Sequence, residues 1–290
     1  MLSFRLEMPA GVPTGVVVAV HGLMESAACL RTMFPAWASQ GLAVLAVDLR
    51  GHGGSPRWTL EQLTKHPGDV MVTDLVAVLN LAEVRRQIRH LPVLLYGHSA
   101  GGGIAAAAAA ALVTHGEATP PANGRAWQVA GVLLEDPFWR LPVTRLQARS
   151  VAEAAYTTLV AAKALVHAKR IDRKKAQWPD WDDAEIQDCC QAQTEADEQL
   201  VRNGNVIPSV PWPAVLDGLK CSGIPVLIVT GTNRVGFTPV HQHLALGHGA
   251  TVEVIRGASH FVRRDAPDAF RKTASKFFAD CIKAVVVNIN

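Results

Sequence analysis

The segment Gly97-His98-Ser99-Ala100-Gly101 combines a nucleophilic hydroxyl with two flanking glycines. An apolar run precedes this segment and an alanine-rich run follows it, which predicts a strand, a sharp turn and a helix. The glycines relieve the crowding of such a turn, and the turn exposes the serine hydroxyl. The alternative, a phosphate-binding turn, needs a G-x-G-x-x-G spacing or a P-loop lysine, and the segment has neither. The pattern therefore favours Ser99 as a nucleophile.

His260 is the candidate general base for Ser99. It lies between the last predicted strand, Thr251–Ile255, and a final amphipathic helix over about Pro267–Lys283. The carboxyl ends of parallel strands meet at one edge of a sheet, so we expect His260 to lie beside Ser99. The chain order of serine, acid and histidine also fits this role.

The remaining histidines are interpreted as surface or packing residues, with His21 and His98 supporting the site. His241 and His243 are spaced like a metal-binding pair, but they lack carboxylate or cysteine partners at ligand spacing. We therefore predict no metal and no cofactor.

These residues need a parallel sheet to bring them together. Short apolar runs bounded by turn residues predict buried strands at Val16–Val20, Ala43–Val47, Pro92–Tyr96, Gly131–Leu134, Val226–Val229 and Thr251–Ile255. Segments with helical spacing alternate with the first of these strands: Leu30–Ser39, Val72–Arg89 and Ile104–Leu112. The alternation predicts an α/β fold with a mostly parallel central sheet and helices on both of its faces.

The strand pattern stops after Pro137 and resumes only after about Ser222. We predict a core domain over residues 1–137 and 223–290, with a helical cap inserted at 138–222. Asp182 and Glu185 resemble a capping pair at the start of a helix that runs past Leu200. Tryptophans concentrate in this range, where they line an apolar pocket or pack between helices: Trp139, Trp178, Trp181 and Trp212.

Composition excludes several classes of protein. The chain has 290 residues, 49% of them hydrophobic, which suffices for a large core. The net charge of +3 is spread along the chain, and the basic run Lys169–Lys175 is interpreted as a solvated helix end, so we predict no nucleic-acid partner. The first residues lack the pattern of a secretory signal, and Ile104–Val113 is too short to span a membrane. Five cysteines without metal spacing favour reduced thiols and a cytoplasmic location.

Three further motifs, together with the Ser99 turn, resemble the α/β-hydrolase superfamily of serine hydrolases. They are His21-Gly22-Leu23, Asp48-Leu-Arg-Gly-His-Gly-Gly-Ser55 and Gly257-Ala-Ser-His-Phe261. The resemblance covers nearly the whole chain outside the predicted cap. It implies that the backbone N–H groups of Leu23 and Ala100 form an oxyanion hole.

The acid of this site departs from the commonest pattern of the superfamily. That pattern has an aspartate just after the strand that corresponds to Val226–Val229, yet residues 218–252 contain no Asp or Glu. A minority of the superfamily draws the acid from the end of the preceding strand, where this chain has Glu135 and Asp136. Asp136 falls at the carboxyl end of that strand, and Glu135 should point to the opposite face because side chains alternate. Asp136 is the preferred acid and Glu135 the alternative.

The sequence therefore favours a serine hydrolase that cleaves a carboxylic ester, lactone or thioester of a small to medium apolar substrate. Carbon–carbon bond hydrolysis and perhydrolysis use the same machinery and stay open. A different class, a receptor-like ligand-binding protein with degenerate catalysis, is favoured only by the missing aspartate after Val229. The sequence carries no signal for an oligomeric state.

Overall fold

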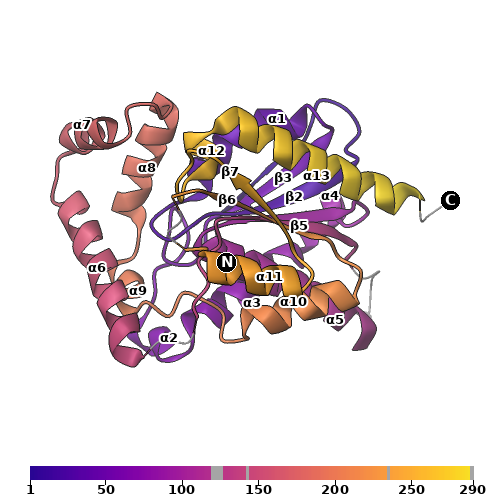
Figure 1. The fold of residues 1–290 in the computed structure, drawn as a ribbon, viewed down its shortest axis with the longest axis horizontal. Coiled ribbons are helices and arrows are strands. Elements are labelled where there is room, and N and C mark those ends of the chain that lie inside the picture. Colours follow the sequence, from indigo (N-terminus) through magenta and orange to yellow (C-terminus); the bar gives the residue numbers. More distant parts are fainter. Residues whose placement is uncertain (119–126, 142–143, 234–235, 288–290) are drawn as a thin grey trace.

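The computed structural model describes residues 1–118, 127–141, 144–233 and 236–287. Within these ranges, seven strands form one sheet in the order β1-β3-β2-β4-β5-β6-β7 (Figure 1). Their bounds are Phe4–Glu7, Gly15–Val20, Leu42–Val47, Val93–His98, Val129–Glu135, Val226–Gly231 and Thr251–Ile255 for β1 to β7. Only β1 runs antiparallel to its neighbour. The predicted α/β fold is confirmed, and β1 is the strand that the sequence pattern missed, because it has four partly exposed residues.

Helices cover both faces of this sheet. Alternate residues of β2 face opposite layers: Val16 and Val18 pack into one apolar cluster, and Val17 packs into the other. The first layer contains α3 (Pro67–Leu79), α4 (Ala82–Ile88), α5 (Ala100–Ala118), α10 (Trp212–Cys221) and α11 (Pro239–Gly247). The second contains the 3₁₀ helix η1 (Ala27–Met33), α1 (Phe34–Ala38), α12 (Val262–Asp265) and α13 (Pro267–Val287). Strand residues buried on both faces explain the continuous apolar runs in the sequence.

Two predicted helices are each divided in the structure. The expected helix Leu30–Ser39 is η1 followed by α1, because Pro35 has no N–H to donate and stands in the first turn of α1. The expected helix Val72–Arg89 is α3 followed by α4, and Leu81 between them has an extended ψ of 136°. A short helix, α2 (Leu60–Thr64), begins at a capping box of Thr59 and Gln62.

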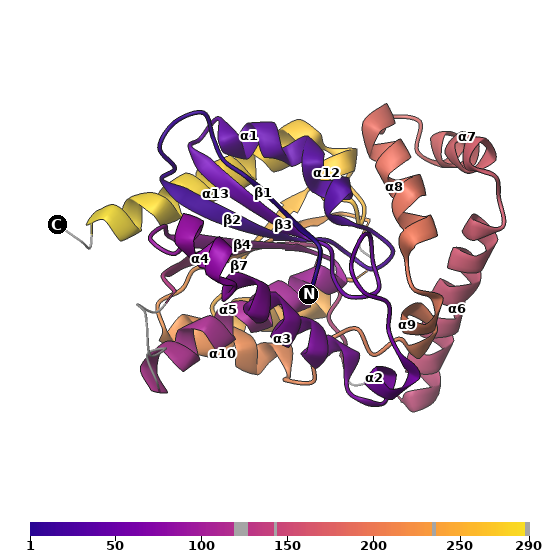
Figure 2. The same ribbon diagram turned by 180° about the vertical axis from the view of Figure 1, so that it is seen from behind.

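Four helices stand to one side of the core in both views: α6 (Arg145–Lys163), α7 (His167–Gln177), α8 (Asp183–Glu195) and α9 (Glu198–Asn203) (Figures 1 and 2). We call them the helical insertion. Asp182 caps α8 as expected, but this helix ends at Glu195, and Asp197 caps the separate helix α9. Although α10 lies within the predicted cap range, its Trp212, Leu216 and Leu219 are buried in the core cluster of the first layer. The domain division itself stays a prediction.

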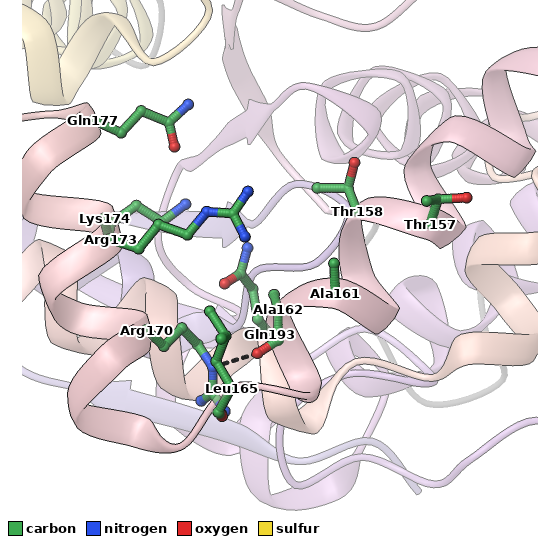
Figure 3. Close-up of a pocket in the computed structure, with 10 residues that line it drawn as sticks. All are labelled: Thr157, Thr158, Ala161, Ala162, Leu165, Arg170, Arg173, Lys174, Gln177 and Gln193. Atoms are coloured by element: carbon green, nitrogen blue, oxygen red, sulfur yellow. Dashed lines mark hydrogen bonds between the residues drawn. The ribbon is translucent and has the colours of Figure 1, made fainter.

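The basic run of α7 is only partly solvated. Arg170 is buried and its guanidinium donates hydrogen bonds to the carbonyl oxygens of Ala162, Leu165 and Cys190. It thereby joins α6, α7 and α8. Arg173 and Lys174 border a pocket of about 270 Å³ between these helices (Figure 3). Among the described residues, no helix is long and apolar enough to cross a membrane.

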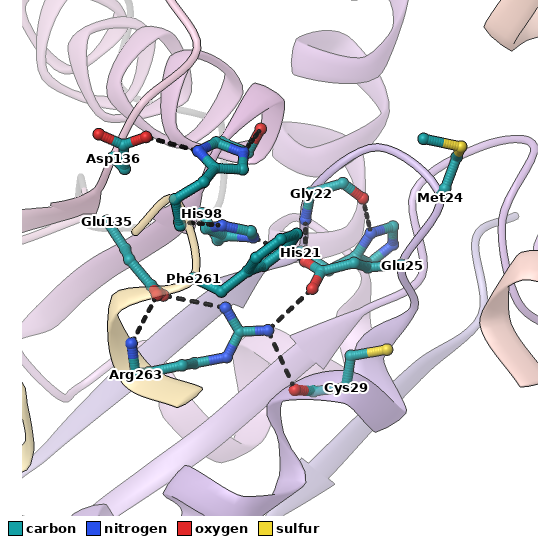
Figure 4. Close-up of polar contacts among 12 residues, drawn as sticks. His21, Gly22, Met24, Glu25, Cys29, His98, Glu135, Asp136, Phe261 and Arg263 are labelled. Carbon is teal, nitrogen blue, oxygen red and sulfur yellow. Dashed lines mark hydrogen bonds and ion pairs between the residues drawn. The ribbon is translucent and has the colours of Figure 1, made fainter. Parts of the chain in front are cut away.

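A buried ion cluster joins three segments of the core. The Arg263 guanidinium contacts Glu135 Oε2 at 3.0 Å and Glu25 Oε1 at 2.9 Å (Figure 4). Glu135 also accepts a hydrogen bond from the Arg263 N–H and one from the Tyr96 hydroxyl. Arg264 pairs with Glu25 and Glu185 at 2.7 Å each. Since Arg263, Arg264 and Glu135 have no exposed side-chain surface, the cluster is stable only as a set of paired charges.

Replacing Arg263 by leucine should therefore destabilise the fold strongly. The substitution leaves two buried carboxylates without their shared partner, and we expect the free energy of unfolding to fall by about 3–5 kcal/mol in urea titrations. Arg271→Leu is the matched control, because Arg271 forms an exposed pair with Asp268. Loss of this pair should lower the free energy of unfolding by less than about 1 kcal/mol. Equal losses for the two variants would contradict the structural role of the cluster.

The same cluster predicts a loss of stability in acid. Burial raises the pKa of Glu25 and Glu135, but the attraction of Arg263 and His98 outweighs it and lowers both below 4.5. Between the folded and unfolded pKa values the unfolded chain binds more protons, so the free energy of unfolding falls as the pH drops below 4.5. In urea unfolding at a series of pH values, Glu135→Gln should show a smaller decrease than the parent. An identical pH dependence in both would refute this assignment.

Candidate active site

Ser99 stands between β4 and α5 in a strained backbone conformation. Its φ is 54°, a region that costs a non-glycine residue about 1–3 kcal/mol. The turn fits closely around its glycines: a Cβ at Gly97 would lie 2.4 Å from the Gly101 carbonyl oxygen, and one at Gly101 would lie 2.2 Å from the His21 carbonyl oxygen. The Ser99 N–H donates to the Glu135 carbonyl oxygen at 3.0 Å, which helps to hold the turn.

His260 contacts both of its expected partners. Its Nε2 lies 2.9 Å from Ser99 Oγ, and its Nδ1 lies 2.5 Å from Asp136 Oδ2. Because an ionised carboxylate only accepts hydrogen bonds, Nδ1 carries a proton and Nε2 is left to accept one from the Ser99 hydroxyl. The structure thus brings together Ser99, His260 and Asp136, which lie far apart in the sequence.

Asp136 follows β5 with a φ of 36° and is fully buried. Its N–H donates to the Val229 carbonyl oxygen at 2.8 Å, and its carboxylate accepts hydrogen bonds from Thr230 Oγ1 at 2.5 Å and the Gly236 N–H at 3.3 Å. The end of β6 has no aspartate. Instead, Thr230 of β6 and Gly236 beyond it donate hydrogen bonds to Asp136. Residues 234–235, which the chain reaches after β6, lie outside the described residues.

Glu135, the alternative acid, lies on the other side of the strand. Its carboxylate contacts Arg263 (Figure 4) and accepts a hydrogen bond from the Tyr96 hydroxyl, and among the described residues no hydrogen bond or ion pair joins it to His260. The alternation of side chains that the sequence predicted separates the two acids in this way.

The two predicted oxyanion residues border Ser99 from different loops. Ala100 begins α5 directly after the serine, where backbone N–H groups lack partners within the helix. Leu23 follows Gly22, and a Cβ at Gly22 would lie 3.2 Å from Ser99 Cβ, so this loop packs against Ser99. Among the described residues, neither the Leu23 nor the Ala100 N–H has a hydrogen-bond acceptor.

Two histidines of the motifs support these loops. His21 Nε2 accepts the Leu49 N–H at 3.0 Å while Nδ1 donates to the Gly22 carbonyl oxygen at 2.8 Å, so this ring needs only one proton. Burial lowers the pKa of His21 in agreement with a neutral ring.

His98, in contrast, faces an acceptor with each ring nitrogen. Nδ1 lies 2.8 Å from Glu25 Oε2 and Nε2 lies 3.1 Å from the His260 carbonyl oxygen. Burial alone would lower the pKa of His98, but the carboxylates of Glu25 and Glu135 outweigh burial and raise it. The geometry therefore assigns His98 an imidazolium that holds the backbone of His260.

Sequence reasoning missed Glu25 and Arg263 as parts of this arrangement. Glu25 Oε2 accepts the Gly22 N–H at 2.8 Å, which fixes the loop that carries Leu23. Both residues are charged side chains in segments that the sequence places near the site. No local pattern reveals that they meet, because their contact joins positions 238 residues apart.

Aromatic rings surround the histidine loop. Phe261 packs edge-on against Trp178 and Trp181, which stack on each other with ring centroids 4.6 Å apart. Trp139 and Trp212 also stack at 4.6 Å, but they lie in the core cluster of the first layer. Trp178 and Trp181 thus pack the helical insertion against Phe261, the residue after His260. Trp139 and Trp212 pack in the core.

Comparison with known proteins gives the family. The family model described as serine aminopeptidase, S33, matches residues 11–187. A monoacylglycerol lipase from Mycolicibacterium smegmatis (strain ATCC 700084 / mc(2)155) is 36% identical over 94 residues, which are 32% of this chain and 31% of that protein. An uncharacterized abhydrolase domain-containing protein from Dictyostelium discoideum is 33% identical over 144 residues, which are 46% of this chain and 14% of that protein. The matches thus span less than a third of either relative.

Solved structures agree on the fold. An esterase from Exiguobacterium antarcticum superimposes with a TM-score of 0.66 over 95% of each chain at 18% sequence identity. At this identity the likeness is one of fold alone. Because the family model spans more than half of the chain, this protein belongs to the serine aminopeptidase S33 family of α/β-hydrolases.

Proposed function

We propose that this protein is a serine hydrolase that cleaves a carboxylic ester, lactone or thioester of a small to medium apolar substrate through an acyl-enzyme on Ser99. The observation that carries the proposal is the pair of contacts made by His260, at 2.9 Å to Ser99 Oγ and at 2.5 Å to Asp136 Oδ2. A nucleophile whose base is itself oriented by an acid is the arrangement that acyl transfer requires.

In the proposed reaction, His260 Nε2 takes the Ser99 proton while Ser99 Oγ attacks the acyl carbon. The Leu23 and Ala100 N–H groups stabilise the oxyanion, and each such donor is worth about 10²- to 10³-fold in rate. His260 then protonates the leaving alcohol or thiol. Water, activated by the same ring, releases the acyl group. Asp136 holds the ring in the required tautomer and stabilises the imidazolium.

The choice of an ester-like substrate is supported by the relatives. The Mycolicibacterium relative is named a monoacylglycerol lipase and the Exiguobacterium structure an esterase. The apolar ring of Phe261, which packs edge-on against the His260 ring, favours an apolar substrate. Carbon–carbon bond hydrolysis and perhydrolysis would use the same residues.

The receptor-like alternative loses its main argument. This alternative rested on the absence of an acid after β6. Asp136, which follows β5, lies within hydrogen-bond distance of His260. We therefore favour catalysis over ligand binding alone.

Removing the nucleophile or its base should abolish hydrolysis. On a series of p-nitrophenyl esters of increasing acyl length, we expect Ser99→Ala and His260→Ala to lower kcat by about 10⁶-fold, the effect of such substitutions in a serine protease. Circular dichroism of the variants checks that they are folded. If the parent is inert toward all esters but cleaves amino-acid p-nitroanilides, the substrate class is wrong; if it cleaves neither substrate, the acyl-transfer proposal fails.

The two candidate acids should differ sharply. Asp136→Asn presents an amide to His260 Nδ1, favours the wrong tautomer and should lower kcat by about 10⁴-fold. Glu135→Gln should keep kcat within a few-fold of the parent, measured where the variant is folded, since Glu135 contacts Arg263 rather than His260. Activity of Asp136→Asn equal to that of the parent would exclude Asp136 as the acid.

A further inference from the structure

Two buried thiols meet where the helical insertion contacts the core. Cys29 belongs to η1 and Cys189 to α8, the insertion helix that packs against η1. The two Sγ atoms and a carboxylate oxygen of Glu25 all lie within 4.8 Å of one another. Both cysteines are free thiols. The proposed function uses neither of them.

Polar contacts hold the two thiols together. Asp188 pairs with Arg31, and Glu185 accepts a hydrogen bond from the Thr32 hydroxyl. Glu185, Asp188 and Cys189 lie three and four residues apart, so they share one face of α8. These two contacts dock this face on η1 next to the thiol pair, which keeps the sulfur atoms close.

The environments of the two thiols are unequal. The hydrogen bond from Cys29 lowers the pKa of Cys189 to about 6; burial opposes this shift and the Arg264 guanidinium adds to it. The same hydrogen bond and burial raise the pKa of Cys29 well above 9.0. Thiolates are the reactive form of cysteine, so Cys189 is the nucleophile of the pair.

Glu25 and the two thiols lie close enough together to bind a metal ion. The Glu25 carboxylate, however, already interacts with four donor groups. It accepts from the Gly22 N–H and His98 Nδ1 and pairs with Arg263 and Arg264. A divalent cation bound between Glu25 and the two thiols would face both buried guanidinium groups at short range. Electrostatic repulsion therefore disfavours a metal, and oxidation of the thiols is the chemistry that remains.

We infer that Cys29 and Cys189 form a redox-active pair that a hydroperoxide converts to a disulfide between η1 and α8. The Cys189 thiolate attacks a peroxide oxygen, so that an S–O bond forms, the O–O bond breaks and hydroxide leaves. The Cys29 sulfur then attacks the sulfenic sulfur, so that the S–S bond forms and water leaves with the Cys29 proton. With the proton from Cys189, two thiols and one hydrogen peroxide yield one disulfide and two waters.

The disulfide would link the helical insertion covalently to the core. Cys189 is 6% exposed and Cys29 is fully buried, so a small peroxide reaches Cys189 first. The link closes a long loop of the chain and so stabilises the folded state. It also fixes α8 beside η1, which follows the loop that carries Leu23 and Glu25. This inference does not depend on ester cleavage, because its readout is the covalent state of sulfur.

The test is peptide mapping of the full chain after treatment with one equivalent of hydrogen peroxide and alkylation with N-ethylmaleimide. We expect a cross-linked peptide that contains Cys29 and Cys189 and that disappears on treatment with dithiothreitol. The oxidised protein should also unfold at a temperature about 5 °C or more above the reduced protein. In Cys29→Ser the reaction should stop at a Cys189 sulfenic acid, which dimedone labels.

Cys190→Ser is the matched control. Cys190 is adjacent, buried and free, but burial raises its pKa, and the variant should form the same cross-link as the parent. Full alkylation of Cys29 and Cys189 after peroxide would overturn the inference, as would a cross-link between other cysteines. Zinc retained at one ion per chain in the parent and lost in Cys29→Ser would overturn it in favour of a metal site.

Discussion

The pairing of one buried guanidinium with two buried carboxylates organises the site. Arg263 follows His260 by three residues, Glu25 follows the loop of Leu23, and Glu135 ends the strand that leads to Asp136. One side chain thus ties together the segments that carry the proposed base, one proposed oxyanion donor and the proposed acid. Charges with no contact to water are tolerated only when each is paired, so these three segments are held in one relative arrangement. His98, the residue before Ser99, connects this ion cluster to the His260 backbone, because its ring contacts Glu25 and the His260 carbonyl oxygen.

Backbone strain gathers at the same place. Among described non-glycine residues, positive φ values occur at Met24, Ser99 and Asp136, one in each loop that meets at the site. Such conformations persist only where surrounding contacts determine them. For Ser99 and Asp136 those contacts are the N–H bonds to the Glu135 and Val229 carbonyl oxygens, so each strand of the sheet supports the turn of its neighbour. The strain lifts side chains off the strand ends toward one another.

The helical insertion contacts the site in several regions, one of them the packing of Leu23 and Met24 against Leu159 and Val201, and two further regions share one residue. Trp178 and Trp181 pack on Phe261 beside the base, and α8 docks on η1 through Glu185, Asp188 and Cys189. Both regions meet at Arg264, whose guanidinium lies over the Trp181 ring and pairs with Glu25 and Glu185. A change in the charge or covalent state of the α8 face therefore acts on Arg264, and through Arg264 on the buried ion cluster.

The sequence by itself determined the parallel sheet, the Ser99 turn and the position of His260, because these depend on local apolar runs and on residues that are neighbours in the chain. It also narrowed the acid to Asp136 or Glu135, since residues 218–252 contain no Asp or Glu, and it favoured Asp136 because side chains alternate along a strand. Only the tertiary structure decided which of the two meets His260, because that depends on the register of β5 against β6 and on the histidine loop packed above them. The assignment of α10 to the core layer likewise follows from long-range packing. Glu25 and Arg263 had no sequence signal, because the pairing of charges distant along the chain leaves no periodic pattern, and only the folded chain brings them into contact.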